Sequence, residues 1–365
     1  MGIRRLTSFL VKNYPQVFRR ESISKFAHKK IAIDISIYIF KFKSKEGESR
    51  WLHALSNLVQ YMRVYDVHPV FIYDLGYPPE KRHEKCRRSR HRATTRSKLS
   101  YLQGVLHRYQ ETGDVDDFVY NRQFDAEMIS DATECQHHTI RQFLGKPRHA
   151  SPDYEDSLKK RIVKLKTSLV TVSRQDYDLS KEVLRMLGVP YFDAVLEADT
   201  VCADLCKRGL VDAAMSEDSD LIAYASPVTI LSLDCELGVV EYVQYDMLLK
   251  TLNFTADQFL DFCILCGCDY IHSSFRDPVM AYNCIKNGTP LPDIEEINNM
   301  EEFARVKSLY KKYDSLPLDH IPKCGFIDKS KFESAFHYIN GLVGGGGETC
   351  ARGETCARGE TCVKG

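Results

Sequence analysis

Short apolar runs alternate along the chain with segments whose apolar residues recur at helical spacing. Residues 30–37 alternate isoleucine with small or polar residues, which is the two-residue period of a strand. Apolar residues recur every three or four positions over 51–62 and predict a helix, and residues 70–73 predict a second, buried strand. Strand, helix and strand in this order are typical of the start of a parallel sheet.

The pattern weakens over residues 76–166, where basic, polar and acidic stretches leave few continuous apolar faces. We interpret this segment as an insertion that is partly helical and mobile. A short repeat, Gly-Glu-Thr-Cys, recurs in the tail at residues 347–350, 353–356 and 359–362. Glycine-rich repeats without large apolar side chains cannot bury a core, so we expect the tail to be disordered.

The regular pattern resumes at Leu169. Ser180 can cap a helix that Gly188 closes, and residues 190–192 begin the next strand. A further short strand is predicted at 213–215. Residues 255–258 form a capping box that starts an apolar helix ending near Gly267, and the chain beyond Tyr270 is mostly polar and helical.

These patterns predict an α/β fold with a mostly parallel central sheet flanked by helices. We divide the 365 residues into an N-terminal α/β region (1–98), an inserted segment (99–167), an internal α/β region (168–270), a helical region (271–343) and a disordered repeat tail (344–365).

Carboxylates stand where the predicted strands and one helix end: Asp34, Asp74, Glu197, Asp199, Asp218, Asp220 and Asp269. Strand ends of an open α/β sheet converge on one crevice. Carboxylates gathered there would repel one another and tend to protonate unless cations held them. Mg²⁺ or Mn²⁺ is the natural counter-charge, because hard divalent ions prefer oxygen ligands. Metal-assisted phosphodiester hydrolysis is therefore the leading hypothesis.

A two-metal mechanism needs several acids and no nucleophilic side chain. We assign one metal to Asp34, Asp74, Glu197 and Asp199, and a second to Asp218, Asp220 and Asp269. Two residues apart on a helix do not share a face, so Glu197 and Asp199 must both project from the turn before their helix. Asp218 and Asp220 lie on one side if the chain stays extended there.

The net charge is zero, with 50 basic and 50 acidic residues, but its distribution is uneven. The segment 81–98 holds one acid, Glu84, among these basic residues: Lys81, Arg82, Lys85, Arg87, Arg88, Arg90, Arg92, Arg96 and Lys98. Such a run is commonly a solvated face or a nuclear-import signal, yet it begins directly after Asp74. We therefore expect its cations over the crevice, with Lys81, Arg82 and Arg88 best placed to offset charge on a reacting phosphate.

Thirteen cysteines are present, and Cys263, Cys266 and Cys268 could form half of a zinc site. No second Cys-x-x-Cys or spaced His pair accompanies them, so we interpret the cysteines as reduced core thiols. No apolar run approaches the roughly 20 residues of a membrane span and no signal peptide is apparent, so a soluble intracellular protein is predicted.

Several motifs, in the same order along the chain, resemble those of the flap-endonuclease or XPG family of structure-specific 5′ nucleases. The resemblance covers roughly residues 1–98 and 168–290. The matching segments are Met1-Gly2-Ile3, Ile31-Ala32-Ile33-Asp34, Tyr73-Asp74, residues 188–194, Glu197-Ala198-Asp199, residues 216–220 and residues 267–270.

The resemblance implies a PIN-like nuclease core, formed by regions 1–98 and 168–270, in which the acids bind two divalent metals, Mg²⁺ or Mn²⁺. It also implies that region 99–167 is an arch or linker and that the C-terminal helical region 271–343 binds duplex DNA. It implies a basic arch that admits single-stranded 5′ ends, and cleavage of branched or flapped DNA near single-strand/duplex junctions in replication or repair. By the same likeness Gly2, Lys81, Arg82, Arg88 and Arg90 contact DNA. Lys81 and Arg88 also take catalytic roles.

Two departures from the family pattern stand out. Asp199 replaces the usual glutamate, which keeps the charge and shortens the reach. Residues 275–278 lack both glycines of a turn whose backbone binds a duplex phosphate in the family, so the grip on duplex DNA is open to question.

Other functions stay open: a PIN-like ribonuclease, a 5′–3′ exonuclease, or a DNA-binding protein without catalysis. A Mg²⁺ phosphatase is disfavoured, because the long basic segment suits a polyanion better than a small ester. We further expect a monomer with no membrane partner and no sliding-clamp peptide in the tail. A nuclear location is expected, in the host nucleus if the protein is virus-encoded.

Overall fold

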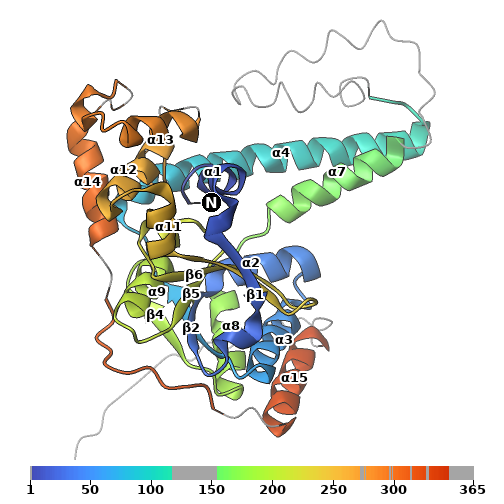
Figure 1. Cartoon of the computed structure of the whole chain (residues 1–365). Coiled ribbons are helices and arrows are strands. Elements are labelled where there is room, and N and C mark those ends of the chain that lie inside the picture. Colours follow the sequence, from blue (N-terminus) through green and yellow to red (C-terminus); the bar gives the residue numbers. More distant parts are fainter. Residues whose placement is uncertain are drawn as a thin grey trace, which may run out of the picture.

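The computed structural model describes residues 2–116, 154–271, 275, 277–295, 297, 299–312, 315–325 and 329–344. Its centre is one seven-stranded sheet in the order β1-β7-β6-β5-β2-β3-β4 (Figure 1). The strands are β1 (Phe18–Ser22), β2 (Lys30–Asp34), β3 (His68–Asp74), β4 (Tyr191–Ala194), β5 (Ala213–Met215), β6 (Val228–Asp234) and β7 (Val239–Gln244). Neighbours from β6 to β4 are parallel, while β7 and β1 add an antiparallel edge. The predicted mostly parallel sheet is confirmed.

Helices surround this sheet. They are α1 (Leu6–Asn13), α2 (Ile35–Glu46), α3 (Trp51–Val64), α4 (Arg82–Thr112), α7 (Tyr154–Ser168), α8 (Arg174–Met186), α9 (Ala198–Lys207), α10 (Asp220–Ala223), α11 (Tyr245–Leu252), α12 (Ala256–Cys266), α13 (Pro278–Lys286), α14 (Met300–Lys311) and α15 (Lys329–Gly344). Short 3₁₀ helices lie at Pro15–Val17, Ile23–Phe26, Pro79–Lys81 and Leu291–Asp293. Every helix of the described residues is too short or too polar to pass through a membrane.

The two faces of the sheet pack into separate cores, and β2 shows why. Ile31 and Ile33 join the core formed with α3 and α8, whereas Ala32 joins the core formed with α9 and α12. Alternation places Asp34 on the side of Ala32, away from the isoleucines, as the sequence predicts. The small side chain at position 32 leaves room for α9 to approach the strand ends.

Two predicted boundaries are wrong, and side-chain capping explains both. The strand of residues 30–37 ends at Asp34, because the Asp34 carboxylate accepts a hydrogen bond from the Ser36 amide at 2.9 Å and starts α2. The helix expected from Ser180 begins at Arg174, since Ser173 and Asp176 form a capping box. Ser180 is instead buried inside α8, and its hydroxyl lies 2.8 Å from that of Tyr73.

The inserted segment is more regular than its sequence suggests. The 31-residue α4 runs unbroken across the 98/99 boundary and packs along α7, so the two helices leave the sheet as a long arm (Figure 1). The buried residues of this small core are Leu102, Val105, Tyr154, Leu158 and Ile162. Residues 117–153 of the predicted insertion lie outside the described residues.

The helical region after Tyr270 divides between the two cores. Helices α13 and α14 extend the core of α12, whereas α15 returns to α3 and α8. His53 packs its ring 5.0 Å from that of Phe336 on α15. The predicted region 271–343 is therefore not one packing unit. Residues 345–365 of the predicted disordered tail, with the sliding-clamp expectation attached to it, lie outside the described residues.

The small core between α4 and α7 should govern the stability of the arm without governing that of the sheet. We expect Leu158→Ala to cost the arm about 2–5 kcal/mol, because Leu158 is almost fully buried there. Hydrogen exchange of amides in α7 and the distal half of α4 should accelerate, while amides of β2 and β3 keep their protection. Val163→Ala is the matched control, since Val163 on the same helix is 61% exposed. Equal effects of the two substitutions would contradict the assigned core.

Candidate active site

The parallel strands deliver the predicted acids to one place. One carboxylate oxygen from each of Asp199, Asp218 and Asp220 lies within 4.8 Å of the other two. This grouping differs from the expected division, which set Asp199 apart from the other two acids. The chain is not extended at 218–220: the amide of Asp220 donates to the Asp218 carboxylate at 3.2 Å as α10 begins.

Asp34 and Asp74 lie beside this group at the ends of β2 and β3. Asp74 accepts from the backbone amide of Ala198 at 2.7 Å and from the Ser36 hydroxyl at 2.6 Å. The first contact ties the end of β3 to the first turn of α9, which carries Asp199. Glu197 is the residue before that helix, whereas Asp199 lies in its first turn, so only Glu197 stands before the helix as expected.

Glu197 and Asp269 are joined to the group through Lys81. The Lys81 ammonium lies 2.7 Å from Glu197, 3.5 Å from Asp269 and 3.9 Å from Asp220. The Arg88 guanidinium, seven residues further along the chain, donates to Asp269 at 2.8 Å. The structure thus brings all seven predicted acids together, with Lys81 and Arg88 among them.

Burial makes the ionised form of this cluster costly. Desolvation, followed by the charges of neighbouring carboxylates, raises the pKa of Asp34, Asp199 and Asp220 well above its ordinary value. Burial also raises the pKa of Asp218. Lys81 responds in the opposite way: burial disfavours its charge, but Asp220 and the other nearby acids outweigh this and raise its pKa well above the usual range.

The donor set fits divalent cations. Two carboxylate oxygens in the cluster, Oδ1 of Asp199 and Oδ2 of Asp220, are buried and accept no hydrogen bond from any described residue. A buried oxygen without a donor is unfavourable unless a cation or water satisfies it. Because the convergent ligands are oxygens and carry negative charge, hard divalent ions match them better than softer metals.

Three tyrosines complete the site, and the sequence interpretation missed their roles. The Tyr270 hydroxyl donates to Glu197 at 3.0 Å and lies 2.6 Å from the Tyr224 hydroxyl, while Tyr310 donates to Asp220 at 3.2 Å. The Lys81 ammonium also sits 5.0 Å from the Tyr270 ring centre. Tyr270 follows Asp269 directly and could have been noticed, but nothing local marks Tyr224 or Tyr310.

A further tyrosine supports Asp74 from α8. The Tyr177 hydroxyl lies 2.6 Å from the Ser36 oxygen, and Ser36 uses its own proton to bind Asp74. Tyr177 must therefore donate to Ser36, which makes a chain of two hydrogen bonds ending on the carboxylate. No sequence signal identifies this contact, because it joins residues from three distant elements.

Gly2 reaches the cluster from the N-terminus. Its φ of +79° belongs to the left-handed region, and a Cβ placed there would lie 1.8 Å from Oδ1 of Asp218. Any side chain at this position would force the Asp218 carboxylate to move.

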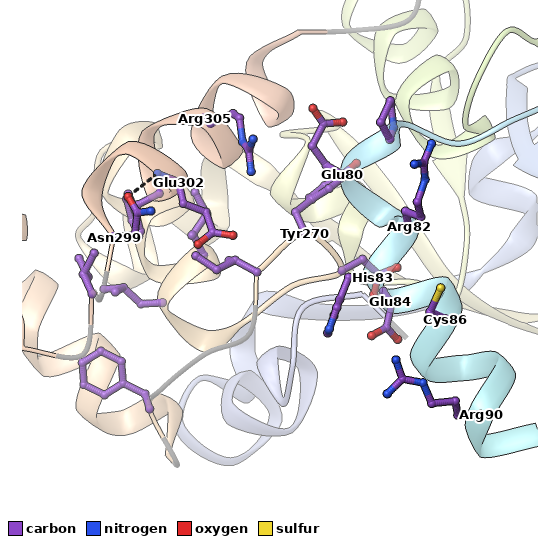
Figure 2. Close-up of a pocket in the computed structure, with 18 residues that line it drawn as sticks. Glu80, Arg82, His83, Glu84, Cys86, Arg90, Tyr270, Asn299, Glu302 and Arg305 are labelled. Carbon is purple, nitrogen blue, oxygen red and sulfur yellow. Dashed lines mark hydrogen bonds between the residues drawn. The ribbon is translucent and has the colours of Figure 1, made fainter. Parts of the chain in front are cut away.

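Arg82 and Arg90 lie apart from the acids. Both are exposed and line a neighbouring cavity between α4 and α14, where Figure 2 shows them with His83 and Arg305. These two cations therefore lie beside the acid cluster and not over it as expected.

Six of the nine cysteines in the described part of the chain are buried. Cys263, Cys266 and Cys268 are buried, and among the residues that the structure describes the only group of three potential metal ligands is Asp199, Asp218 and Asp220. The interpretation as core thiols therefore holds for these three, whereas Cys86 and Cys235 are exposed and do not fit it. At the altered turn, residues 272–274 and 276 lie outside the described part, and Asp277 accepts from the Val279 amide at 3.0 Å to start α13.

Two family models match the two halves of this site. The XPG N-terminal domain matches residues 1–95 and the XPG I-region matches residues 188–269. The chain belongs to the XPG family of flap endonucleases. Divalent-metal dependence is typical of this family, in agreement with the acidic cluster.

Relatives and solved structures extend the likeness beyond the two matched regions. The probable RAD2-like endonuclease 369L of Invertebrate iridescent virus 6 is 25% identical over 358 residues, covering 90% of this chain and 84% of the viral protein. Flap endonuclease 1 of Lachancea thermotolerans is 27% identical, covering 81% of this chain and 67% of its own length.

The fold agrees with two solved nucleases of low sequence identity. The catalytic core of Rad2 in complex with DNA substrate is 17% identical with a TM-score of 0.56, covering 94% of this chain and 98% of its own. Flap endonuclease-1 from Methanococcus jannaschii is 15% identical with a TM-score of 0.54, covering 90% and 95%. The chain therefore shares the fold of these two proteins.

The raised acid pKa values predict that ionisation destabilises the metal-free protein. The folded state holds extra protons above the ordinary aspartate pKa of 3.8, so stability should fall as the pH rises from about 4 towards neutrality. Asp220→Asn removes one of these charges and should raise the melting temperature of the chelator-treated protein at pH 7 by roughly 2–4 °C. It should also reduce the stabilisation that added Ca²⁺ gives. Asp178→Asn, at an exposed position of α8, is the control. An unchanged melting temperature in both variants would contradict the destabilisation by ionised acids.

The bridge from Tyr177 to Asp74 predicts a defect in metal affinity. Tyr177→Phe removes the donor to Ser36, so Asp74 should be held less firmly and apparent Mn²⁺ affinity should fall about 10-fold. Calorimetric titration of Mn²⁺ measures the affinity directly, without turnover. Tyr65→Phe removes a tyrosine hydroxyl at the C-terminal end of α3, beside Tyr61, and should change nothing. Equal affinities for all three proteins would exclude the coupling between Tyr177 and Asp74.

Proposed function

We propose that the protein is a divalent-metal-dependent endonuclease that cuts branched or flapped DNA near junctions between single-stranded and duplex segments. The observation that carries this proposal is the convergence of seven carboxylates with Lys81 and Arg88 at the base of the basic helix α4. A cluster that combines metal ligands with buried cations suits a reaction at a phosphate, which brings negative charge into the site.

Mg²⁺ is the proposed physiological ion, with Mn²⁺ as a substitute. Two ions would be held by Asp34, Asp74, Glu197, Asp199, Asp218, Asp220 and Asp269. When bound, they would supply an activated water and stabilise the leaving oxygen of the phosphodiester. The grouping of Asp199 with Asp218 and Asp220 supports a shared position for these three acids.

Lys81 and Arg88 would bind the scissile phosphate. Lys81 is only 11% exposed and, because its pKa is raised, stays protonated at neutral pH. Both cations are held by acids in this structure, so their side chains are fixed near the cluster before substrate arrives. A phosphate entering beside the acids can take over part of these contacts, and the cations then neutralise the charge that builds up on the phosphate during attack.

Tyr270 would keep Lys81 in position. Its ring supports the ammonium and its hydroxyl holds Glu197, the nearest carboxylate to Lys81. Gly2 would let the DNA backbone pass close to Asp218, since no side chain occupies that space.

The arm of α4 and α7 favours a nucleic acid over a small phosphate ester. Its basic side chains lie on α4, the helix that begins directly after Lys81 and carries Arg88. An extended polyanion could therefore contact both the arm and the acids. Arg82 and Arg90 would contact the DNA strand beside the cluster. We propose a role in DNA replication or repair, in the nucleus, by a monomer.

A panel of end-labelled branched DNAs with Mg²⁺ tests this proposal. Flap, bubble, gapped and four-way-junction substrates should be compared with matched RNA flaps, and cuts should map near the junction of the DNA substrates. Asp218→Ala is the inactive control. Preferential cutting of RNA would favour a ribonuclease, products of one nucleotide would favour a 5′–3′ exonuclease, and no metal-dependent product would favour a DNA-binding protein without catalysis.

Lys81→Ala should separate chemistry from folding. Loss of the ammonium should lower kcat by roughly 100-fold or more, because a charge aimed at the phosphate is lost, while DNA binding in Ca²⁺ changes much less. Lys250→Ala on the surface of α11 provides the matched control. Single-turnover cleavage measures the effect, and a rate equal to that of the control would remove Lys81 from the mechanism.

A further inference from the structure

A buried ion pair outside the acid cluster joins α2 to α8. The Lys43 ammonium lies 2.9 Å from both carboxylate oxygens of Asp176, and the two side chains are only 5% and 7% exposed. Burial opposes the charge of each group, yet their contact, with Glu48 beside Lys43 and Ser173 beside Asp176, outweighs it. The pKa of Lys43 is therefore raised and that of Asp176 is lowered, so both groups are ionised at neutral pH.

The same pair holds the segment that connects the arm to α8. Residues 169–173 join the end of α7 to the start of α8 (Figure 1). Lys43 donates to the Thr171 carbonyl at 3.3 Å, and Asp176 accepts from the amide and the hydroxyl of Ser173, each at 2.7 Å. Loss of either ion would leave the other charge buried without its partner, so the pair fixes the first turn of α8 against α2.

The two helices meet again at the acid cluster. Tyr177 follows Asp176 directly, and its hydroxyl lies 2.6 Å from that of Ser36, which donates to Asp74 at 2.6 Å. Ser36 and Lys43 are seven residues apart, which is about two turns of α2, so they lie on the same face of that helix. Among the described residues, neither Lys43 nor Asp176 makes a hydrogen bond or ion pair with the seven acids. The pair can therefore reach Asp74 only through the two helices.

We propose that Lys43 and Asp176 are positioning residues for Asp74. Their ion pair holds α8 in the register in which Tyr177, acting through Ser36, orients the Asp74 carboxylate for a divalent cation. A shift of α8 on α2 that breaks the pair also withdraws the Tyr177 hydroxyl from Ser36. The inference rests on the proposed function, because it takes Asp74 as a metal ligand, and it adds that metal affinity depends on a contact outside the acid cluster.

A double substitution tests the pair without leaving one charge buried alone. Lys43→Met keeps the apolar stem and Asp176→Asn keeps an acceptor for Ser173, so the combined variant should fold, as thermal melting checks. Its affinity for Mn²⁺, measured by calorimetric titration, should fall about fivefold. In a Tyr177→Phe background the same double substitution should change Mn²⁺ affinity by less than about twofold, because the path to Asp74 is already broken.

A milder variant keeps the test decisive if the double variant does not fold. Asp176→Asn alone leaves Lys43 paired with Glu48, which lies 2.9 Å from its ammonium. It should lower Mn²⁺ affinity by about threefold in the wild-type background and by much less in the Tyr177→Phe background. Arg185→Met combined with Glu182→Gln is the matched control, since it removes an exposed ion pair of the same helix and should leave Mn²⁺ affinity unchanged.

The Mg²⁺ dependence of cleavage separates positioning from a loss of folded protein. For the double variant, the Mg²⁺ concentration that gives half the maximal single-turnover rate should rise about fivefold, while the rate at saturating Mg²⁺ stays within about twofold of wild type. A merely structural defect would lower the saturated rate and leave that concentration unchanged.

Wild-type Mn²⁺ affinity in the Lys43 and Asp176 variants would overturn the positioning role. Losses that simply add to that of Tyr177→Phe would also overturn it, because the pair would then not act through Tyr177. Both results leave the proposed function standing. An absence of Mn²⁺ binding and of Mg²⁺-dependent cleavage in the wild-type protein is a different result, which would overturn the nuclease function and this inference together.

Discussion

The site depends on holding mutually repelling carboxylates in a crevice that excludes much of the water. Desolvation and neighbouring charge together raise the pKa of Asp34, Asp199 and Asp220, so their ionised forms are unfavourable in the metal-free protein. The fold tolerates this because donors surround the cluster: the Ser36 and Ala198 amides and the tyrosines 270 and 310 each satisfy one acid. The remaining negative charge is what makes the crevice selective for cations.

Lys81 and Arg88 offset part of that charge from the protein itself. Their pairing with Glu197 and Asp269 means that the side chains most useful at a phosphate are ordered by the same acids that would hold the metals. Under the proposed function, substrate binding would exchange one set of charge contacts for another, without the cost of ordering two long flexible side chains. One set of contacts would then serve stability, metal binding and catalysis.

The sequence predicted the acids well because each follows a short, strongly patterned element. The period of two around Asp34 and the capping box before the helix that leads to Asp269 are local signals. The arm was harder to predict, since α4 has few apolar residues and becomes a packed helix only when Leu102 and Val105 meet Tyr154 and Leu158 from a distant segment. Tyr177, Tyr224 and Tyr310 were missed for the same reason: their partners come from other elements, and a single sequence carries no record of such contacts. Likewise, no local signal in the sequence predicts that α15 packs against α3 and α8.

Helix α4 connects the acid cluster with the neighbouring cavity. Arg88 and Arg90 are two residues apart, so they leave the helix in different directions. Arg88 binds Asp269, while Arg90 reaches the wall shared with α14. Because backbone hydrogen bonds between residues four apart hold a helical turn together, a displacement of Arg90 must also move Arg88 relative to Asp269. The acid cluster and the wall of the cavity are thereby coupled through one turn of α4.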